Sequence, residues 1–390
     1  MGKYNFDEVI NRYNTSSLKW DFNLERGKQK DILPFWVADM DFKLPNEILD
    51  PLTKKINIGI FGYSECSNDY YSAVSNWFKK HYGIKVSKEN IIITPSVVFS
   101  ICTLIRILTK EFDSIIINEP VYYPFKESII VNNRKAIISN LVLENDKYVI
   151  DYNDFEKKII DNNVKAYILC NPHNPVGRAW TEDELIKIFD ICNKHNVFII
   201  SDEIHADFVY ENNKFNSAHK FLKKNFAICS ALTKTFNIPG LQIAHTYISD
   251  DLIYKRFEKE LDKVGYSQLS IFGLVASEEL FNNGDEYLEE LKKYLWNNIL
   301  FVKEYIETKF KKLKLIIPDA TYLLWLDFSN YGYTDKELKD IITYKCNLWL
   351  DDGLIFGKSG IKHQRINIAC PRKKLKEALD NLYNVFELAL

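Results

Sequence analysis

Four short β-rich stretches of the chain are each followed by a distinctive polar or aromatic residue. These residues are an amide at Asn174, a carboxylate at Asp202, an amine at Lys234 and a phenol ring at Tyr122. In open α/β sheets, ligands bind beyond the carboxyl ends of the strands. We therefore expect the four side chains to meet in one crevice, where they could bind and activate a small carbonyl compound.

The same four groups suit a pyridine aldehyde that carries a phosphate. Lys234 could attack the aldehyde, and Asp202 could keep the pyridine nitrogen protonated so that the ring withdraws electrons. Asn174 could donate a hydrogen bond to the ring oxygen, while Tyr122 could stack on the ring. An apolar setting would lower the pKa of the lysine enough for it to act as a base. These residues predict a site for pyridoxal 5'-phosphate (PLP).

The β-rich stretches indicate an α/β fold with a mainly parallel sheet of the seven-stranded type. Their apolar residues are consecutive, which is expected when helices cover both faces of a sheet. Helical patterns lie between them, such as residues 181–195, where Thr181 and Glu184 form a capping box. The stretches cover residues 91–93, 114–117, 166–169, 197–200 and 226–229.

The length of 390 residues predicts more than one domain. Residues 51–285 carry the alternating pattern of a large PLP-binding α/β domain. Residues 286–390 begin with a long amphipathic helix and predict a smaller α+β domain, with which the irregular segment 1–50 is expected to pack. The strands of the smaller domain are expected near 313–317, 321–328 and 364–368, with a closing helix from about 372.

Composition and charge favour an enzyme that acts on a small molecule. A net charge of −2 gives no electrostatic basis for binding nucleic acid or an anionic membrane. No apolar run approaches the ~18 residues of a membrane span. The seven cysteines are scattered without a CxxC pair, which disfavours a disulfide framework or a metal site. The first residues lack the apolar stretch of a signal peptide, so we expect a cytoplasmic protein.

Longer motifs resemble the aminotransferase class I/II family of fold-type I PLP enzymes along nearly the whole chain. The resemblance is greatest to its bacterial cystathionine β-lyase or C–S lyase branch, the MalY/PatB type. The motifs are residues 36–42 (WVADMDF), 61–64 (FGYS), 120–125 (PVYYPF), 174–177 (NPVG), 201–205 (SDEIH), 234–241 (KTFNIPGL), 320–327 (ATYLLWLD) and 365–371 (RINIACP).

The resemblance implies that Lys234 forms a Schiff base with PLP and moves the substrate's Cα proton. It assigns the pyridine nitrogen to Asp202, the ring oxygen to Asn174 and the ring face to Tyr122. The substrate α-carboxylate is expected to bind Arg365 bidentately. Ala38 and Asn174 are expected to contribute to the same substrate site.

The resemblance also implies a phosphate site and a homodimer. Backbone N–H groups of Val97 and Val98 should bind the phosphate at a helix N-terminus. Thr233 is the preferred hydroxyl at that site and Ser230 the second choice. Tyr63, counted with Lys234 and Tyr122 among the catalytic candidates, should reach the phosphate of the neighbouring subunit.

Two positions differ from aspartate-type aminotransferases. His205, a further candidate cofactor contact, stands where those enzymes have a tyrosine on the ring oxygen. Gln242 stands where they have a phosphate-binding arginine. Both differences favour the C–S lyase branch.

The predicted reaction is α,β-elimination on L-cystathionine, L-cysteine or a cysteine S-conjugate, giving a thiol, pyruvate and ammonia. One alternative is an aminotransferase of class I/II, which begins with the same proton removal at Cα. A second alternative is a non-catalytic regulatory protein of the same fold. The intact set of Lys234, Asp202, Asn174 and Arg365 disfavours the second alternative.

Overall fold

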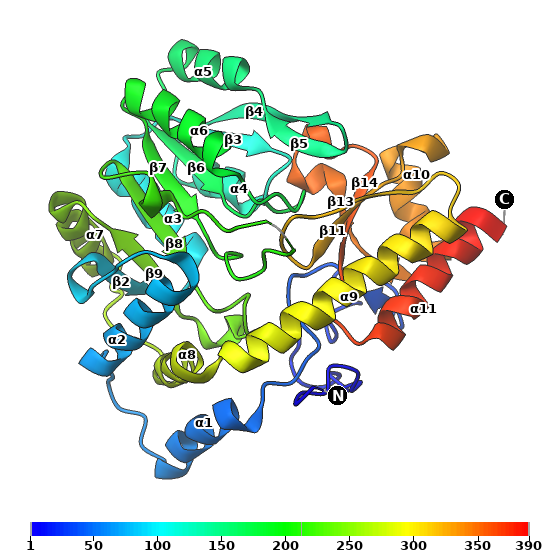
Figure 1. The fold of residues 1–390 in the computed structure, drawn as a ribbon, viewed down its shortest axis with the longest axis horizontal. Helices are drawn as coiled ribbons and strands as arrows, with labels where there is room; N and C mark the ends of the chain where they lie inside the picture. The colour runs from blue at the N-terminus through cyan, green and yellow to red at the C-terminus, as the bar shows by residue number, and fades with distance from the viewer. Residues whose placement is uncertain (1, 212, 389–390) are drawn as a thin grey trace.

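The computed structural model describes residues 2–211 and 213–388. A large twisted sheet occupies one side of the molecule and a smaller sheet the other, and the long helix α9 (Asp285–Lys309) runs from below the large sheet along the smaller one (Figure 1). In order across the large sheet, the strands are β2 (Ile91–Thr94), β9 (Ala244–Ile248), β8 (Phe226–Ser230), β7 (Phe198–Asp202), β6 (Ala166–Cys170), β3 (Ser114–Glu119), β4 (Lys135–Glu144) and β5 (Lys147–Ile150).

The large sheet is parallel through its centre and antiparallel towards both edges. Strands β8, β7, β6, β3 and β4 run in parallel, whereas β9 is antiparallel to both β8 and β2. The sheet has one strand more than the seven-stranded type, because β5 folds back antiparallel along the outer end of β4.

Alternate residues of the central strands face two separate apolar cores. In β6, Tyr167 and Leu169 belong to one core, while Ile168 and Cys170 belong to the other. Because both faces of the sheet are covered, the strands carry consecutive apolar residues, as the sequence indicated. The first core also receives α5 (Tyr152–Asp161), α6 (Glu182–Lys194) and α8 (Ile271–Asn283), and the second receives α3 (Val97–Leu108), α4 (Pro124–Val131) and α7 (Asp251–Lys263).

The smaller sheet is antiparallel and lies beside the C-terminal helices. Its strands, in order, are β10 (Lys314–Ile316), β11 (Leu323–Asp327), β14 (His363–Asn367) and β13 (Asp351–Asp352). The remaining helices are α1 (Asn46–Ile58), α2 (Asn68–Trp77), α10 (Asp335–Asp340) and α11 (Arg372–Tyr383), the last of which contacts α9.

The N-terminal segment contacts the C-terminal part of the chain. Strand β1 (Leu33–Pro34) pairs in parallel with β12 (Leu348–Trp349). The Phe35 amide then donates to the Trp349 carbonyl at 2.8 Å. These pairings support our proposal that residues 1–50 pack with the smaller domain of residues 286–390.

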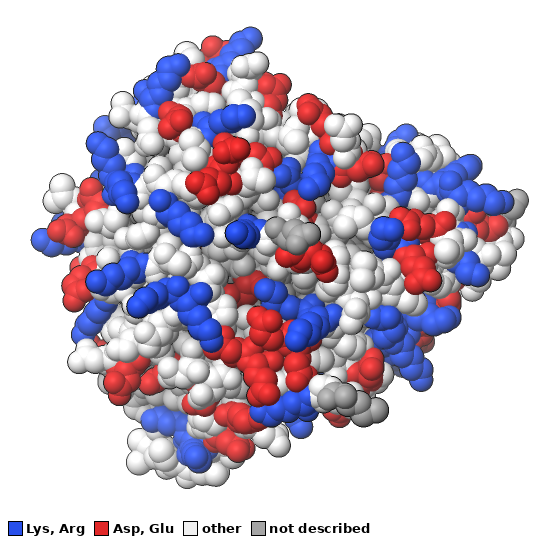
Figure 2. Space-filling view, in the orientation of Figure 1, with Lys and Arg blue, Asp and Glu red and all other residues white. Residues whose placement is uncertain are grey.

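Charged side chains of both signs are interspersed over the face shown in Figure 2. Across residues 2–211 and 213–388, no helix combines the length and apolarity that crossing a bilayer requires.

Candidate active site

A cavity of about 210 Å³ lies at the carboxyl end of the parallel strands. This volume far exceeds the ~10–15 Å³ that one water needs, so the cavity can hold a small molecule. It contains ten of the residues that the sequence predicted for the site: Ala38, Val97, Val98, Tyr122, Asn174, Asp202, His205, Thr233, Lys234 and Arg365.

Strand register explains why these residues meet. Cys170 of β6 pairs with Asp202 of β7, which in turn pairs with Cys229 of β8. The three strands therefore end at one edge of the sheet. The loops that carry Asn174 and Lys234 begin at that edge, beside the Asp202 carboxylate.

The Lys234 amine lies in this cavity and donates a hydrogen bond to the Ala38 carbonyl oxygen at 2.7 Å. Burial lowers the pKa of Lys234 to about 8, and the Arg365 charge acts in the same direction. The carboxylates of Asp39 and Asp202 oppose this shift. A substantial fraction of the amine is thus neutral near pH 8, as a nucleophile or base requires.

Asp202 is a buried carboxylate with a single hydrogen bond. It accepts from the Ile204 amide at 3.1 Å and makes no salt bridge with the part of the chain that the structure describes. Burial raises the pKa of Asp202 to about 7. A buried carboxylate without a cation is costly, so this position suits a ligand that brings a protonated nitrogen.

Arg365, from strand β14 of the smaller sheet, meets Asn174, from the loop after β6, in the cavity lining. Arg365 Nη1 donates to Asn174 Oδ1 at 2.9 Å, and Nη2 donates to the Trp36 carbonyl at 2.8 Å. The Asp351 carboxylate also contacts Nη2. Because the amide oxygen of Asn174 is occupied by Arg365, its Nδ2 group is the end that can donate to a ligand.

The N-terminus of helix α3 supplies backbone donors. Ser96 is the N-cap, and its side chain accepts from the Phe99 amide at 3.1 Å. Val97 and Val98 are the first two residues of the helix, so their amides have no partners within it. The positive end of the helix dipole lies at the same place. This end of the cavity therefore suits an anion such as a phosphate.

Tyr122 and His205 complete the walls of the cavity. The Tyr122 amide donates to the Asn174 carbonyl at 3.0 Å, which holds the backbone of Tyr122 against the NPVG loop. Burial lowers the pKa of His205 to about 3, so its ring is neutral and contributes no positive charge.

Two predicted residues lie outside the cavity lining, Ser230 and Tyr63. Successive strand side chains alternate between faces. Since Cys229 pairs beside Asp202, Ser230 points to the opposite face of β8. Tyr63 is 92% exposed and lies at a separate hollow near Tyr71.

Asp351 is the functional candidate that the sequence prediction missed. It is buried, lines the cavity and contacts Arg365, and burial raises its pKa to about 6. Its strand β13 has only two residues, so no periodic pattern indicated which way the side chain points. The other lining residues not predicted are mostly apolar or aromatic: Trp36, Val37, Pro95, Ser96, Tyr123, Cys170, Ile204 and Pro239.

The profile of the family "Aminotransferase class I and II" matches residues 31–382. The chain belongs to this family. Cystathionine beta-lyase PatB of Bacillus subtilis (strain 168) is 37% identical over 379 residues, which cover 96% of this chain and 98% of PatB. Both findings confirm the family and the branch that the sequence motifs resembled.

Solved structures of this family confirm the α/β fold. Cystalysin from Treponema denticola, whose crystal structure contains pyridoxal 5'-phosphate, aligns with a TM-score of 0.95 and 32% identity over 99% of this chain and 100% of that chain. A PLP-bound protein from Clostridium difficile 630, described as an aminotransferase, aligns with a TM-score of 0.95 and 44% identity over 98% of this chain and 100% of that chain.

Proposed function

We propose that this protein is a PLP-dependent C–S β-lyase that releases a thiol from L-cystathionine, L-cysteine or a cysteine S-conjugate. The arrangement of Lys234, Asp202 and Arg365 around one cavity is the observation that carries the proposal. The similarity to PatB supports this branch of the family over others.

The cavity fits PLP at each end of that molecule. Asp202 is a buried carboxylate that makes no salt bridge with the described residues, which suits the protonated pyridine nitrogen. Lys234 offers an amine of lowered pKa to the aldehyde. The free amides at the start of α3 suit the phosphate, with the Thr233 hydroxyl in the same lining. When bound, PLP supplies an electron-withdrawing ring that makes the Cα proton of an amino acid removable.

The residues of the chain then divide the work of elimination. Arg365, which lines the cavity, orients the substrate through its α-carboxylate. Lys234 Nζ takes the proton from Cα, and the Cβ–S bond breaks with its electron pair leaving on sulfur. The thiolate gains a proton, and hydrolysis of the remaining three-carbon unit gives pyruvate and ammonia.

An aminotransferase activity on the same site is the second candidate. The similarity to the Clostridium difficile protein described as an aminotransferase favours it. Both reactions need Lys234 to remove the Cα proton. They differ in the next step, because a transaminase returns the proton to the cofactor carbon and keeps the Cβ substituent.

Incubation with L-cystathionine alone tests the proposal. A lyase releases pyruvate and thiol over many turnovers without an added keto acid, and Lys234→Ala abolishes this release. A single half-turnover that stops at pyridoxamine phosphate would instead identify a transaminase.

We further propose that the enzyme works as a homodimer in the cytoplasm. Exposed apolar side chains gather between α1 and α2, at Ile58, Ile60 and Phe61, next to Tyr63. Such a patch favours contact with a second copy of the chain, and Tyr63 would then reach the partner's phosphate site. The seven unpaired cysteines favour a reducing compartment.

A further inference from the structure

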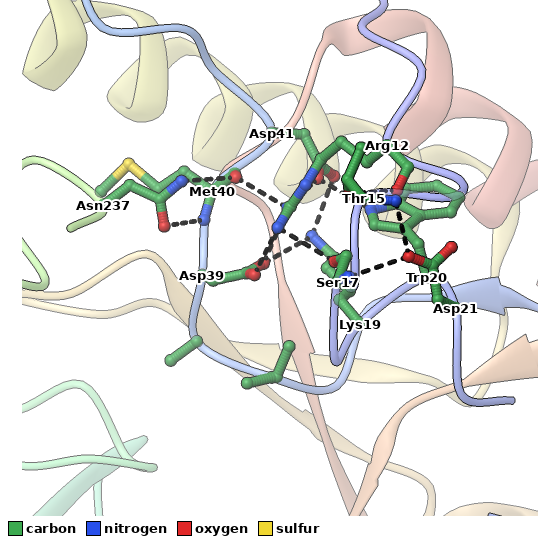
Figure 3. Close-up of polar contacts among 12 residues, drawn as sticks. Arg12, Thr15, Ser17, Lys19, Trp20, Asp21, Asp39, Met40, Asp41 and Asn237 are labelled. Carbon is green, nitrogen blue, oxygen red and sulfur yellow. Dashed lines mark hydrogen bonds and ion pairs between the residues drawn. The ribbon is translucent and has the colours of Figure 1, made fainter. Parts of the chain in front are cut away.

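Four charged residues near the N-terminus form a partly buried ion-pair cluster, which consists of Arg12, Lys19, Asp39 and Asp41 (Figure 3). Arg12 contacts both oxygens of Asp39, at 2.9 and 3.2 Å, and reaches Asp41 at 2.7 Å. Lys19, only 1% exposed, lies 2.8 Å from Asp41 and 3.4 Å from Asp39. Two cations thus neutralise two carboxylates, of which Asp41 is buried and Asp39 partly exposed.

The cluster holds the irregular segment 37–41, which has no strand partner of its own. Arg12 donates to the Met40 carbonyl at 3.0 Å. Asn237 brackets the same residue, because its side chain accepts from the Met40 amide at 2.9 Å and donates to the Met40 carbonyl at 2.8 Å. Asn367 donates to the Asp39 carbonyl at 2.6 Å. Contacts from three distant parts of the chain therefore fix this segment.

The segment is in direct contact with the reactive lysine. Ala38, which lies immediately before Asp39, accepts the hydrogen bond of the Lys234 amine at 2.7 Å. Any shift of the backbone at Asp39 is transmitted to this carbonyl through one peptide unit. The ion-pair cluster is thus connected to Lys234 through a fixed stretch of backbone.

The Asp39 carboxylate belongs to the cluster, and its charge favours the ammonium form of Lys234. Its effect on the lysine is larger than that of Asp202, while Arg365 acts in the opposite direction and His205 is neutral. Tyr322, whose hydroxyl lies 3.4 Å from the Ala38 carbonyl, packs against the same place and is also uncharged. Buried charges of this kind are poorly screened by solvent. How far Asp39 stabilises a charged lysine therefore depends on how well Arg12 and Lys19 neutralise it.

We propose that Arg12 and Lys19 are positioning residues for Lys234: they hold the Ala38 carbonyl against its amine and keep the Asp39 charge from stabilising the ammonium form. This inference rests on the proposed capture of PLP by Lys234. It assigns a role in the active site to Arg12 and Lys19, whose side chains are not among those that line the cavity.

The test measures the rate at which the full-length chain, freed of PLP, captures added PLP covalently as a function of pH, followed by visible absorbance. Arg12→Gln removes one cation from the cluster. We expect the midpoint of the pH profile to rise by on the order of one unit, because a less neutralised Asp39 favours the charged lysine. The double variant R12Q/D39N removes the anion as well and should lose this rise.

Arg106→Gln is the matched control, because Arg106 makes a similar partly buried ion pair with Glu260 at 2.7 Å, remote from the cavity. It should lose stability without moving the midpoint. Lys19→Met provides a second variant with the same expected direction.

Each outcome separates the two proposals. If the unsubstituted chain captures no PLP at any pH, the proposed function fails and this inference fails with it. If the unsubstituted chain captures PLP, and the Arg12→Gln and Lys19→Met variants show the same midpoint of the pH profile, only the positioning role is overturned. A rise that persists in R12Q/D39N also overturns it, because Asp39 then cannot be the cause.

Discussion

At the scale of single residues, burial is the main influence on the chemistry of this site. It lowers the pKa of Lys234 to about 8 and raises the pKa of Asp202 to about 7. Both shifts disfavour charge in the absence of a ligand. A ligand with a protonated ring nitrogen and an aldehyde would relieve both, which is a physical reason for tight binding of PLP.

Asp202→Asn should stabilise the PLP-free protein while impairing catalysis. The folded-state pKa of Asp202 lies above its ordinary value, so this carboxyl destabilises the fold increasingly as pH rises from about 4 to about 7. At pH 8 we expect the variant to melt ~2–5 °C higher than the parent. The difference should shrink towards pH 4, and calorimetry at both pH values measures it.

The same variant should lose ~10²-fold in pyruvate release, because an amide cannot hold the ring nitrogen in its charged form. Unchanged melting at pH 8 together with full activity would contradict both expectations.

Asp351 should weaken substrate binding through its contact with Arg365. The Asp351 carboxylate occupies Nη2 and cancels much of the positive charge that a substrate carboxylate needs. Asp351→Asn is therefore expected to lower KM several-fold with little change in kcat. Steady-state kinetics on cystathionine measure this split. An increase in KM would show instead that Asp351 serves to orient the guanidinium.

At the scale of elements, the ends of strands and the start of one helix define the site. The register of β6, β7 and β8 brings three loops to one edge. Helix α3 begins at Val97 beside them, with its N-cap Ser96 in an extended conformation. The catalytic candidates and the phosphate donors are therefore positioned by regular structure rather than by long loops.

Val97→Pro should isolate the contribution of one backbone N–H. Proline is tolerated at the first position of a helix, and the extended Ser96 before it accommodates the ring. Loss of one donor to a charged phosphate should weaken PLP affinity ~10-fold. Val97→Ala, which keeps the N–H, is the matched control. Equal PLP affinities of the two variants, measured by equilibrium dialysis, would rule out this amide as a donor.

At the scale of the whole molecule, Tyr63 is the predicted site residue that lies at a hollow separate from the cavity. Tyr63 is 92% exposed and does not line the cavity of its own chain. The exposed apolar residues beside it suggest where a second copy would bind. The proposed dimer would therefore complete each site rather than merely join two finished ones.

Tyr63→Phe should weaken PLP binding ~10-fold, because it removes one hydroxyl donor to the partner's phosphate. The variant should remain a dimer, since the apolar patch is unchanged. Sedimentation and PLP titration, carried out on the same samples, measure the two effects. A parent protein that sediments as a monomer at working concentration, or an unchanged PLP affinity, would contradict the shared site.

The sequence by itself determined the residues that follow the strands. Asn174, Asp202, Lys234 and Tyr122 could be assigned to one crevice because local patterns predict strands, and the ends of parallel strands meet at one edge. The α/β fold followed from the consecutive apolar residues of those strands. The sequence analysis preferred Thr233 to Ser230 as the phosphate hydroxyl, and in the structure Thr233 lines the cavity whereas Ser230 does not.

Only the tertiary structure placed Asp351 against Arg365 and Arg12 and Lys19 against Asp39. These contacts join segments that are separated along the chain and lie in short or irregular structure, where periodicity carries no information. Their partners are selected by burial, because a charge removed from water must find an opposite charge wherever the fold provides one. Residues at strand ends can thus be predicted from local sequence patterns. The charges that set the pKa of Lys234 depend instead on packing across the whole molecule.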